Sequence, residues 1–173
     1  QSPVTMNMGA TMNSWYDIKG LGPGSEEDHQ GMKAAGVALN GLAHAACEKY
    51  NVPFKNTIFA GFSQGAVISL WASVVAKEKV GGVIMLSGYF GGKDVMPNHV
   101  EDYNREVPVI MCHGEQDPLI SLQMSQMSYK GVTDLLKFKD VTYKTYRGLV
   151  HSANPQEIAD VSKWIAARNV WKQ

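Results

Sequence analysis

A serine, a histidine and an aspartate in this chain are spaced so that together they could perform nucleophilic acyl chemistry. The serine is Ser63, at the centre of Gly61-Phe62-Ser63-Gln64-Gly65, which matches the pattern G-x-S-x-G. That pattern is typical of a sharp turn between a strand and a helix, because small residues on either side of the serine let the backbone fold back on itself. An apolar, strand-like segment ends at Phe62 and a helical pattern starts at Gln64. These surroundings favour a nucleophile over an idle serine in a glycine-rich turn.

A serine hydroxyl is a weak nucleophile at neutral pH and needs a neighbouring base. The chain has five histidines. Four of them lie where a helix face, a polar loop or a buried strand end gives a structural or solvent-facing role: His29, His44, His99 and His113. His151 lies instead in the loop between the last predicted strand and the final predicted helix. Because loops after the carboxyl ends of parallel strands converge on one site, we expect His151 to be the base.

The remaining member should be an acid between Ser63 and His151, since hydrolases with a strand–turn–helix serine keep the order Ser…Asp…His along the chain. The aspartates in this interval are Asp94, Asp102, Asp117, Asp134 and Asp140. Asp117 directly follows the strand before the one that leads to His151, and Glu115 is its nearest rival. A loop aspartate before a proline is usually a turn former. Three residues in this order, each just after a strand, nevertheless predict a triad of Ser63, Asp117 and His151.

Alternating strand-like and helical segments must position these residues. Short apolar runs without polar alternation indicate strands that are covered on both faces, as in parallel sheets; they occupy residues 57–60, 83–86, 107–112 and 141–146. Helical patterns cover residues 25–50, 64–79, 122–138 and a final segment from Asn154 onward. This alternation predicts an α/β fold with a mostly parallel sheet and helices on both faces.

Local signals mark the ends of several elements. Ser25 is the expected cap of the first helix, because the acidic residues that follow it suit a helix N-terminus. Asn154-Pro155-Gln156-Glu157 combines an asparagine cap, a proline in the first turn and a glutamate three residues on. We expect the first helix to bury the face that carries Met32, Ala35, Leu39, Leu42, Ala46 and Tyr50, and close packing against a sheet to explain its glycines. The first 24 residues, which contain Met6, Met8 and Met12, are expected to form an irregular loop or hairpin.

Composition excludes several classes of function. The formal net charge is zero and the sequence pI is about 7.1, so no electrostatic footprint for nucleic acid is present. Lys and Arg form no polybasic anchor, and the longest apolar runs are too short to span a bilayer. We therefore expect at most peripheral membrane contact, and neither a metal nor a cofactor. Cys47 and Cys112 are expected to be reduced thiols, as in a cytoplasmic protein.

Four stretches resemble the acyl-protein thioesterases, a branch of the α/β hydrolases that includes small carboxylesterases and lysophospholipases. They are Ser14-Trp15-Tyr16-Asp17, Gly61 to Gly65, His113-Gly114-x-x-Asp117-Pro118-Leu119 and Gly148-x-x-His151-Ser152, which run almost end to end. The resemblance implies that Ser63 is acylated, that His151 is the general base and acid, and that Asp117 orients the imidazole. It also implies that the backbone N–H of Gln64 is one oxyanion donor and that Trp15 lies near the acyl-binding channel.

The resemblance also implies the substrates and the setting of the reaction. They are fatty-acyl thioesters on proteins, or related acyl esters, cleaved through an acyl-enzyme in the cytoplasm. S-acylated proteins would then be partners of this chain. The methionines near the N-terminus suit a pocket for flexible acyl chains, although methionine is more often plain core filling.

One departure from the family pattern is large. Family members carry an earlier strand and a His-Gly-x-Gly-type loop that supplies a second oxyanion N–H, and this sequence has no such segment. The missing strands and connections correspond to about 60 residues. We therefore expect residues 1–173 to be a single α/β-hydrolase domain that lacks its first strands and oxyanion loop. The alternative is a catalytically impaired hydrolase fold that serves as a binding module, since losing one oxyanion donor costs about a hundredfold to a thousandfold in rate.

Overall fold

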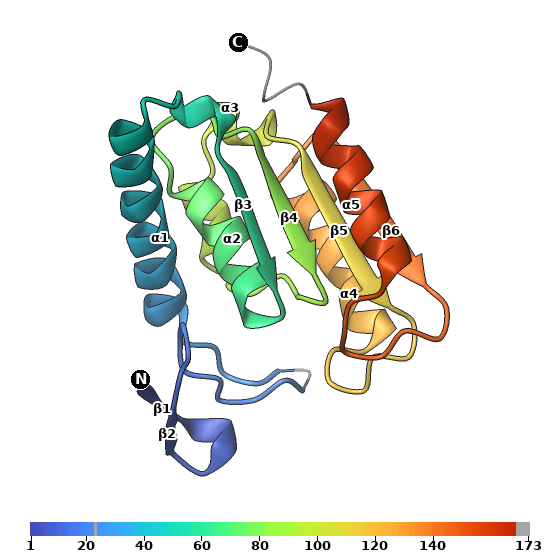
Figure 1. Cartoon of the computed structure of the whole chain (residues 1–173). Coiled ribbons are helices and arrows are strands. Elements are labelled where there is room, and N and C mark those ends of the chain that lie inside the picture. The colour runs from blue at the N-terminus through green and yellow to red at the C-terminus, as the bar shows by residue number, and fades with distance from the viewer. Residues whose placement is uncertain (23, 169–173) are drawn as a thin grey trace.

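The computed structural model of the chain describes residues 1–22 and 24–168 (Figure 1). The strands in this part are β1 (Ser2–Val4), β2 (Ala10–Met12), β3 (Ile58–Phe62), β4 (Gly82–Leu86), β5 (Val109–Gly114) and β6 (Val141–Tyr146). The helices are α1 (His29–Tyr50), α2 (Gln64–Val74), α3 (Asp102–Arg105), α4 (Leu122–Lys130) and α5 (Pro155–Ala167). Short 3₁₀ turns lie at Thr5–Asn7, Phe54–Asn56 and Met96–His99, and a π-helical turn at Gly131–Leu135 follows α4. The predicted alternation of strands and helices is confirmed.

The main sheet is parallel and its strands lie side by side in chain order, β3-β4-β5-β6. Its carboxyl ends all point toward the lower side of the view in Figure 1. Parallel pairing therefore brings the segments that follow β3, β5 and β6 to one edge of the sheet. Among the described residues the sheet ends at β3 and at β6. That further strands precede it stays a prediction.

Helices cover both faces of this sheet, as expected from the apolar strands. One face of β4 and β5 packs into a core shared with α1, α2 and the α4 region, through Val83, Met85, Val109 and Met111. The opposite face packs into a smaller core with α5, through Ile84, Ile110, Cys112 and Trp164. Neighbouring residues of a strand point to opposite faces, so the continuous apolar runs supply both cores.

Close packing of α1 on α2 depends on a glycine. A Cβ atom at Gly36 would lie 2.8 Å from the Cβ atom of Trp71. The expectation that close packing explains a glycine of this helix is therefore right at Gly36, but the partner is α2 rather than a sheet. At Gly41 a Cβ atom would meet nothing within 4 Å. Packing therefore does not explain Gly41.

The start of α1 differs from the prediction. The helix begins at His29, and its cap is Asp28, whose side chain accepts the backbone N–H of Gly31 at 2.9 Å. The predicted cap, Ser25, is therefore wrong, because it lies three residues before Asp28 and outside the helix.

The buried face of α1 carries Met32, Gly36 and Asn40. The periodicity also predicts Leu42, Ala46 and Tyr50 on the buried face, but all three are exposed. The buried face differs from the predicted one because the residues that contact α2 include a glycine and an asparagine. A pattern of apolar residues alone does not detect them. The two helices thus pack through small and polar groups as well as apolar ones.

The final strand and helix agree closely with the sequence signals. Strand β6 has the predicted bounds, and α5 begins at Pro155. The side chain of Asn154 accepts the backbone N–H of Glu157 at 2.8 Å, which confirms the predicted cap. Helix α2 ends at Val74, about a turn before the predicted end near residue 79.

The N-terminal segment forms a hairpin, as predicted. Strands β1 and β2 pair antiparallel, and Met8 at the turn has a left-handed backbone and a fully exposed side chain. The carboxylate of Asp17 accepts the backbone N–H and the hydroxyl of Thr5 at 2.7 and 2.6 Å. This contact ties the hairpin to the segment that leads toward α1.

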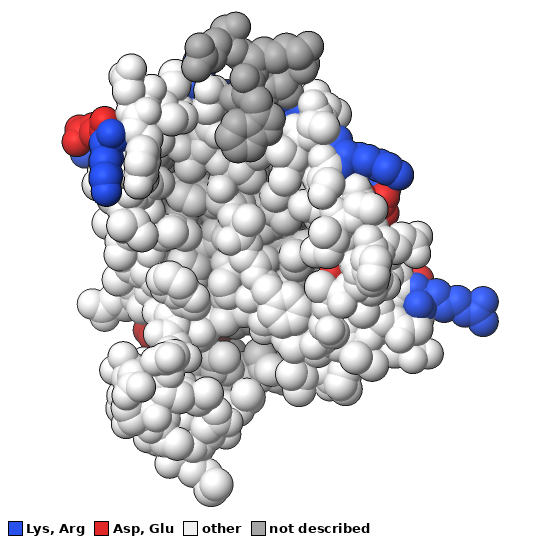
Figure 2. Space-filling model, viewed as in Figure 1, with Lys and Arg blue, Asp and Glu red and all other residues white. Residues whose placement is uncertain are grey.

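The face of the molecule seen in Figure 2 carries few charged side chains, and its Lys and Arg residues lie apart from one another near the edges. No helix within residues 1–22 and 24–168 is long and apolar enough to cross a bilayer. Cys47 and Cys112 are both free thiols.

Candidate active site

Ser63 lies at the sharp turn between β3 and α2 and has a strained backbone, with φ 55° and ψ −119°. Its N–H donates to the carbonyl of Leu86 at 2.8 Å, and its carbonyl accepts the N–H of Ala66 at 3.0 Å. A Cβ atom at Gly61 would lie 2.1 Å from the carbonyl oxygen of Gly65, so the turn requires glycine there. The small residues around Ser63 therefore permit the strained backbone at the residue that carries the hydroxyl.

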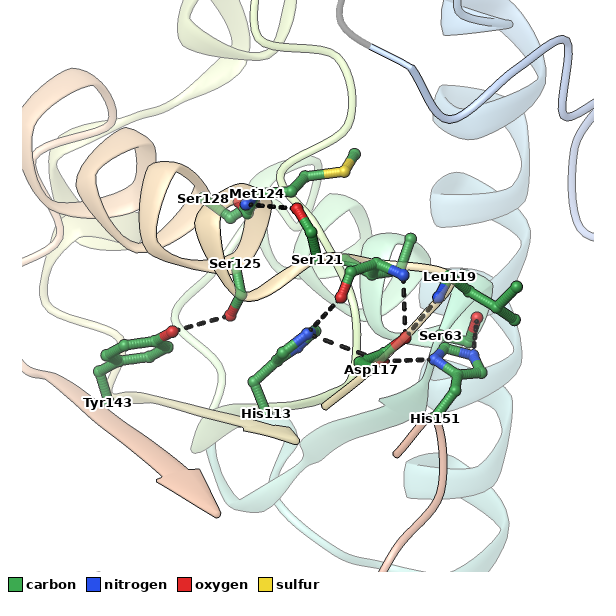
Figure 3. A network of polar contacts seen from close by, with 11 residues as sticks. Ser63, His113, Asp117, Leu119, Ser121, Met124, Ser125, Ser128, Tyr143 and His151 are labelled. Atoms are coloured by element: carbon green, nitrogen blue, oxygen red, sulfur yellow. Dashed lines mark hydrogen bonds and ion pairs between the residues drawn. The ribbon is translucent and has the colours of Figure 1, made fainter. Parts of the chain in front are cut away.

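Three loops bring Ser63, Asp117 and His151 into contact (Figure 3). The Nε2 atom of His151 lies 3.0 Å from Oγ of Ser63, and its Nδ1 atom lies 2.7 Å from Oδ2 of Asp117. Because Nδ1 faces a carboxylate, we assign the ring proton to Nδ1, which leaves Nε2 with a lone pair toward the serine hydroxyl. This arrangement is able to remove the hydroxyl proton as Ser63 attacks a carbonyl carbon.

The carboxyl group of Asp117 is buried and accepts several hydrogen bonds. Its Oδ1 atom accepts the backbone N–H groups of Leu119 and Ile120, both at 2.9 Å. Burial works to raise the pKa of Asp117, but the hydrogen bonds from His151 and from these two N–H groups outweigh it and hold the pKa below its ordinary value. Asp117 is therefore a carboxylate at neutral pH and stabilises a positively charged imidazole beside it.

Glu115, the rival acid, lies elsewhere. Its side chain is exposed and accepts the hydroxyl of Thr145 on β6 at 2.8 Å. Glu115 therefore bonds to a surface residue of β6, whereas Asp117 contacts the imidazole of His151.

His113 supports the same loop from inside, in line with the structural role expected for it. It is buried, and its Nε2 atom lies 2.8 Å from the carbonyl oxygen of Ile120 and 3.6 Å from Oδ2 of Asp117 (Figure 3). Since a carbonyl only accepts, Nε2 carries the proton. Burial lowers the pKa of His113 despite the contact with Ile120, so the ring is neutral.

The backbone N–H of Gln64 is positioned to act on a developing negative charge. Gln64 is the first residue of α2, so its N–H has no acceptor within the helix and lies at the positive end of the helix dipole. This position next to Ser63 suits an oxyanion donor. In the described ranges, 1–22 and 24–168, no group of three or more His, Cys, Asp or Glu side chains could hold a metal ion.

Apolar side chains are exposed around the triad. Phe62, Leu119 and Val150 are each close in sequence to a triad residue and are each about half exposed. Trp15 is 52% exposed, and its indole nitrogen would lie 4.0 Å from a Cβ atom at Gly65. The structure thus places Trp15 at the nucleophile turn, with apolar surface available to a substrate.

The three methionines of the N-terminal hairpin are exposed to different degrees. Met6 and Met12 are partly exposed and Met8 is fully exposed. The expectation that all three help to line an acyl channel stays a prediction, and the full exposure of Met8 counts against its part in it.

Comparison with known proteins gives consistent matches over nearly the whole chain. The phospholipase/carboxylesterase family profile matches residues 1–169. Acyl-protein thioesterase 1 of Yarrowia lipolytica is 34% identical over 166 residues, which cover 95% of this chain and 73% of that protein. The crystal structure of Arabidopsis thaliana SOBER1 superposes with a TM-score of 0.89 at 24% identity and covers 96% of this chain and 79% of that one. Zea mays acyl-protein thioesterase 2 gives a TM-score of 0.84 at 22% identity, over 96% of this chain and 77% of that one.

Proposed function

Because the chain belongs to the phospholipase/carboxylesterase family and is a serine hydrolase with the α/β-hydrolase fold, we propose that Ser63, His151 and Asp117 are its catalytic triad. The observation that carries this proposal is the continuous line of contacts from Oγ of Ser63 through the imidazole to Oδ2 of Asp117, at 3.0 and 2.7 Å. The strained turn at Ser63 keeps the hydroxyl at the end of that line.

In the acylation step, Oγ of Ser63 attacks the carbonyl carbon of the acyl substrate and His151 takes the hydroxyl proton on Nε2. The carbonyl oxygen becomes negatively charged and accepts the backbone N–H of Gln64. The imidazolium, stabilised by Asp117, then gives its proton to the leaving thiolate or alkoxide as the bond to the acyl carbon breaks. The product is an ester between the acyl group and Ser63.

Deacylation repeats these steps with water as the nucleophile. His151 accepts a proton from the attacking water on Nε2, and the hydroxide adds to the acyl carbon. The tetrahedral intermediate collapses, the bond to Oγ breaks, and the imidazolium returns its proton to Ser63. The free fatty acid leaves and the enzyme is restored.

For the substrate, we propose fatty-acyl thioesters on proteins, with related acyl esters as further substrates. Relatives such as the Yarrowia lipolytica protein are acyl-protein thioesterases by name. The exposed apolar side chains of Phe62, Leu119 and Val150 beside the triad suit an acyl chain. We also propose a cytoplasmic location, for which the free thiols of Cys47 and Cys112 are the supporting observation.

The test uses three substrates that present one acyl group through different leaving groups. They are a peptide with S-palmitoyl cysteine, the same peptide with O-palmitoyl serine, and lysophosphatidylcholine, with release of palmitic acid measured by mass spectrometry. We expect the S-palmitoyl peptide to be cleaved fastest, and the Ser63→Ala variant to cleave none of the three. An intact S-palmitoyl peptide alongside hydrolysed lysophosphatidylcholine would overturn the proposed substrate. Hydrolysis that survives in Ser63→Ala would overturn the triad.

A further inference from the structure

The side chain of Gln64, next to the nucleophile, is bonded to a segment about 50 residues away in the sequence. Its Oε1 atom accepts the backbone N–H of Trp15 at 3.0 Å. Its Nε2 atom donates to Oγ of Ser14 at 2.9 Å and to the carbonyl oxygen of Tyr16 at 2.8 Å. The amide thus joins the segment of residues 14–16 directly to the nucleophile turn.

These contacts fix which way the amide points. The N–H of Trp15 needs an acceptor and the carbonyl of Tyr16 needs a donor, so the oxygen and nitrogen of the Gln64 amide have only one satisfactory orientation. The side chain bonds to the backbone N–H of Trp15 and the backbone carbonyl of Tyr16, as a peptide group would. A glutamate has no donor for the carbonyl of Tyr16, and an asparagine is one methylene shorter. The site is therefore specific for glutamine.

The rest of this segment is held by other residues. The hydroxyl groups of Tyr16 and Tyr89 lie 2.9 Å apart in a buried position. The backbone N–H of Asp17 donates to the carboxylate of Asp28 at 3.0 Å. These contacts secure the segment after Trp15, whereas Gln64 holds the backbone of Trp15 itself.

We propose that the side-chain amide of Gln64 determines acyl-chain specificity by positioning Trp15 at the nucleophile turn. The indole of Trp15 is half exposed beside Gly65 and offers apolar surface near the reacting carbon. Without the amide, the N–H of Trp15 loses its acceptor and the indole no longer has a fixed place over the acyl chain. Gln64 therefore has two separate duties, an oxyanion N–H on its backbone and a positioning amide on its side chain. This inference rests on the proposed acyl-enzyme at Ser63.

The test separates the side chain of Gln64 from its backbone. Gln64→Met keeps the length, the neutral charge, the helix propensity and the backbone N–H, and removes the hydrogen bonds of the amide to Ser14, Trp15 and Tyr16. We would measure kcat/KM for p-nitrophenyl esters from acetate to palmitate, and use the ratio of long-chain to acetate values as the readout. We expect this ratio to fall about tenfold, the effect of one to two net hydrogen bonds. Gln126→Met, the same change on an exposed turn of α4, should leave the ratio as it is.

A double-mutant cycle shows whether Gln64 acts through Trp15. If it does, Gln64→Met should lower the ratio no further in a Trp15→Ala background, because the indole is already gone. An equal fall in both backgrounds would overturn the proposal, as would an unchanged ratio in the single variant. A thermal melt accompanies each variant. If Gln64→Met does not fold, Ser14→Ala, which removes one contact of the amide, should still lower the ratio, by about threefold.

The controls keep this inference distinct from the proposed function. Fluorophosphonate labelling of Ser63 in the wild-type chain reports the nucleophile alone, whatever the acyl chain length. Labelling without any rise of kcat/KM with chain length would overturn the role of Gln64 and leave the triad intact. No labelling and no hydrolysis would instead remove the proposed function, and the inference with it.

Discussion

Replacing Asp117 with asparagine tests the triad in a way that the structure makes specific. The Oδ1 position continues to accept the N–H groups of Leu119 and Ile120, at 2.9 Å in the native chain, so the side chain stays in place. The new amide NH₂ then occupies the position 2.7 Å from Nδ1 of His151 and donates to it. The ring proton must move to Nε2, which leaves no lone pair toward the hydroxyl of Ser63.

The expected loss follows from this change of tautomer. The same substitution in the general Ser-His-Asp mechanism lowers kcat by about 10⁴-fold, or about 5.5 kcal/mol at 1.36 kcal/mol per factor of ten. We expect a fall of about 10³-fold to 10⁴-fold in kcat for Asp117→Asn. The value of KM should change little, because the Asp117 side chain is buried behind His151.

The assay is steady-state hydrolysis of p-nitrophenyl butyrate, with a thermal melt for each variant. Glu115→Gln is the matched control, because Glu115 is an exposed acid of the same loop that contacts Thr145. It should keep its activity within about twofold, as a surface substitution does. Activity of Asp117→Asn within about tenfold of wild type would refute the assigned tautomer. A larger loss in Glu115→Gln would assign the orienting role to the other acid.

Three further predictions concern stability and reactivity. Glu157→Gln should raise the melting temperature at neutral pH. Among the described residues the buried Glu157 carboxyl has no side-chain partner, and burial raises its pKa above the unfolded value. Ionisation therefore weakens the native state, and calorimetry should show the gain shrinking as the pH falls toward the ordinary glutamate range. Gly61→Ala should prevent folding or activity, because its Cβ atom would lie 2.1 Å from a backbone oxygen, whereas Gly41→Ala should stabilise the protein by about 1 kcal/mol in urea unfolding. Cys112 should resist a thiol reagent at pH 8 until the protein unfolds, because burial raises the pKa of its thiol to about 11, in contrast to the half-buried Cys47.

Where a feature depends on neighbouring residues, the sequence was sufficient to predict it. The cap at Asn154 and the bounds of β6 follow from local patterns, and the structure has both. The turn at Ser63 needs only the small residues around it. That Ser63, Asp117 and His151 lie together could be predicted because parallel strands bring the loops that follow them to one edge.

Features that depend on distant partners could not be predicted in this way. Asp28 caps α1 and also accepts the N–H of Asp17, and no local pattern distinguishes it from Ser25 as the cap. Asn40 is buried because its amide donates to the carbonyl of Ala72 on α2 at 2.9 Å, which an apolar periodicity does not detect. The contacts of the Gln64 amide depend in the same way on the path of the N-terminal segment.

The most direct test of the triad is to locate the residue that a fluorophosphonate modifies in the native chain. After labelling, proteolysis and mass spectrometry, we predict one adduct, on Ser63, and none in Ser63→Ala. The Asp117→Asn variant should label at a rate lowered in proportion to its loss of kcat, because both reactions need His151 to accept the hydroxyl proton. An adduct on another serine, or labelling that persists in Ser63→Ala, would contradict the account.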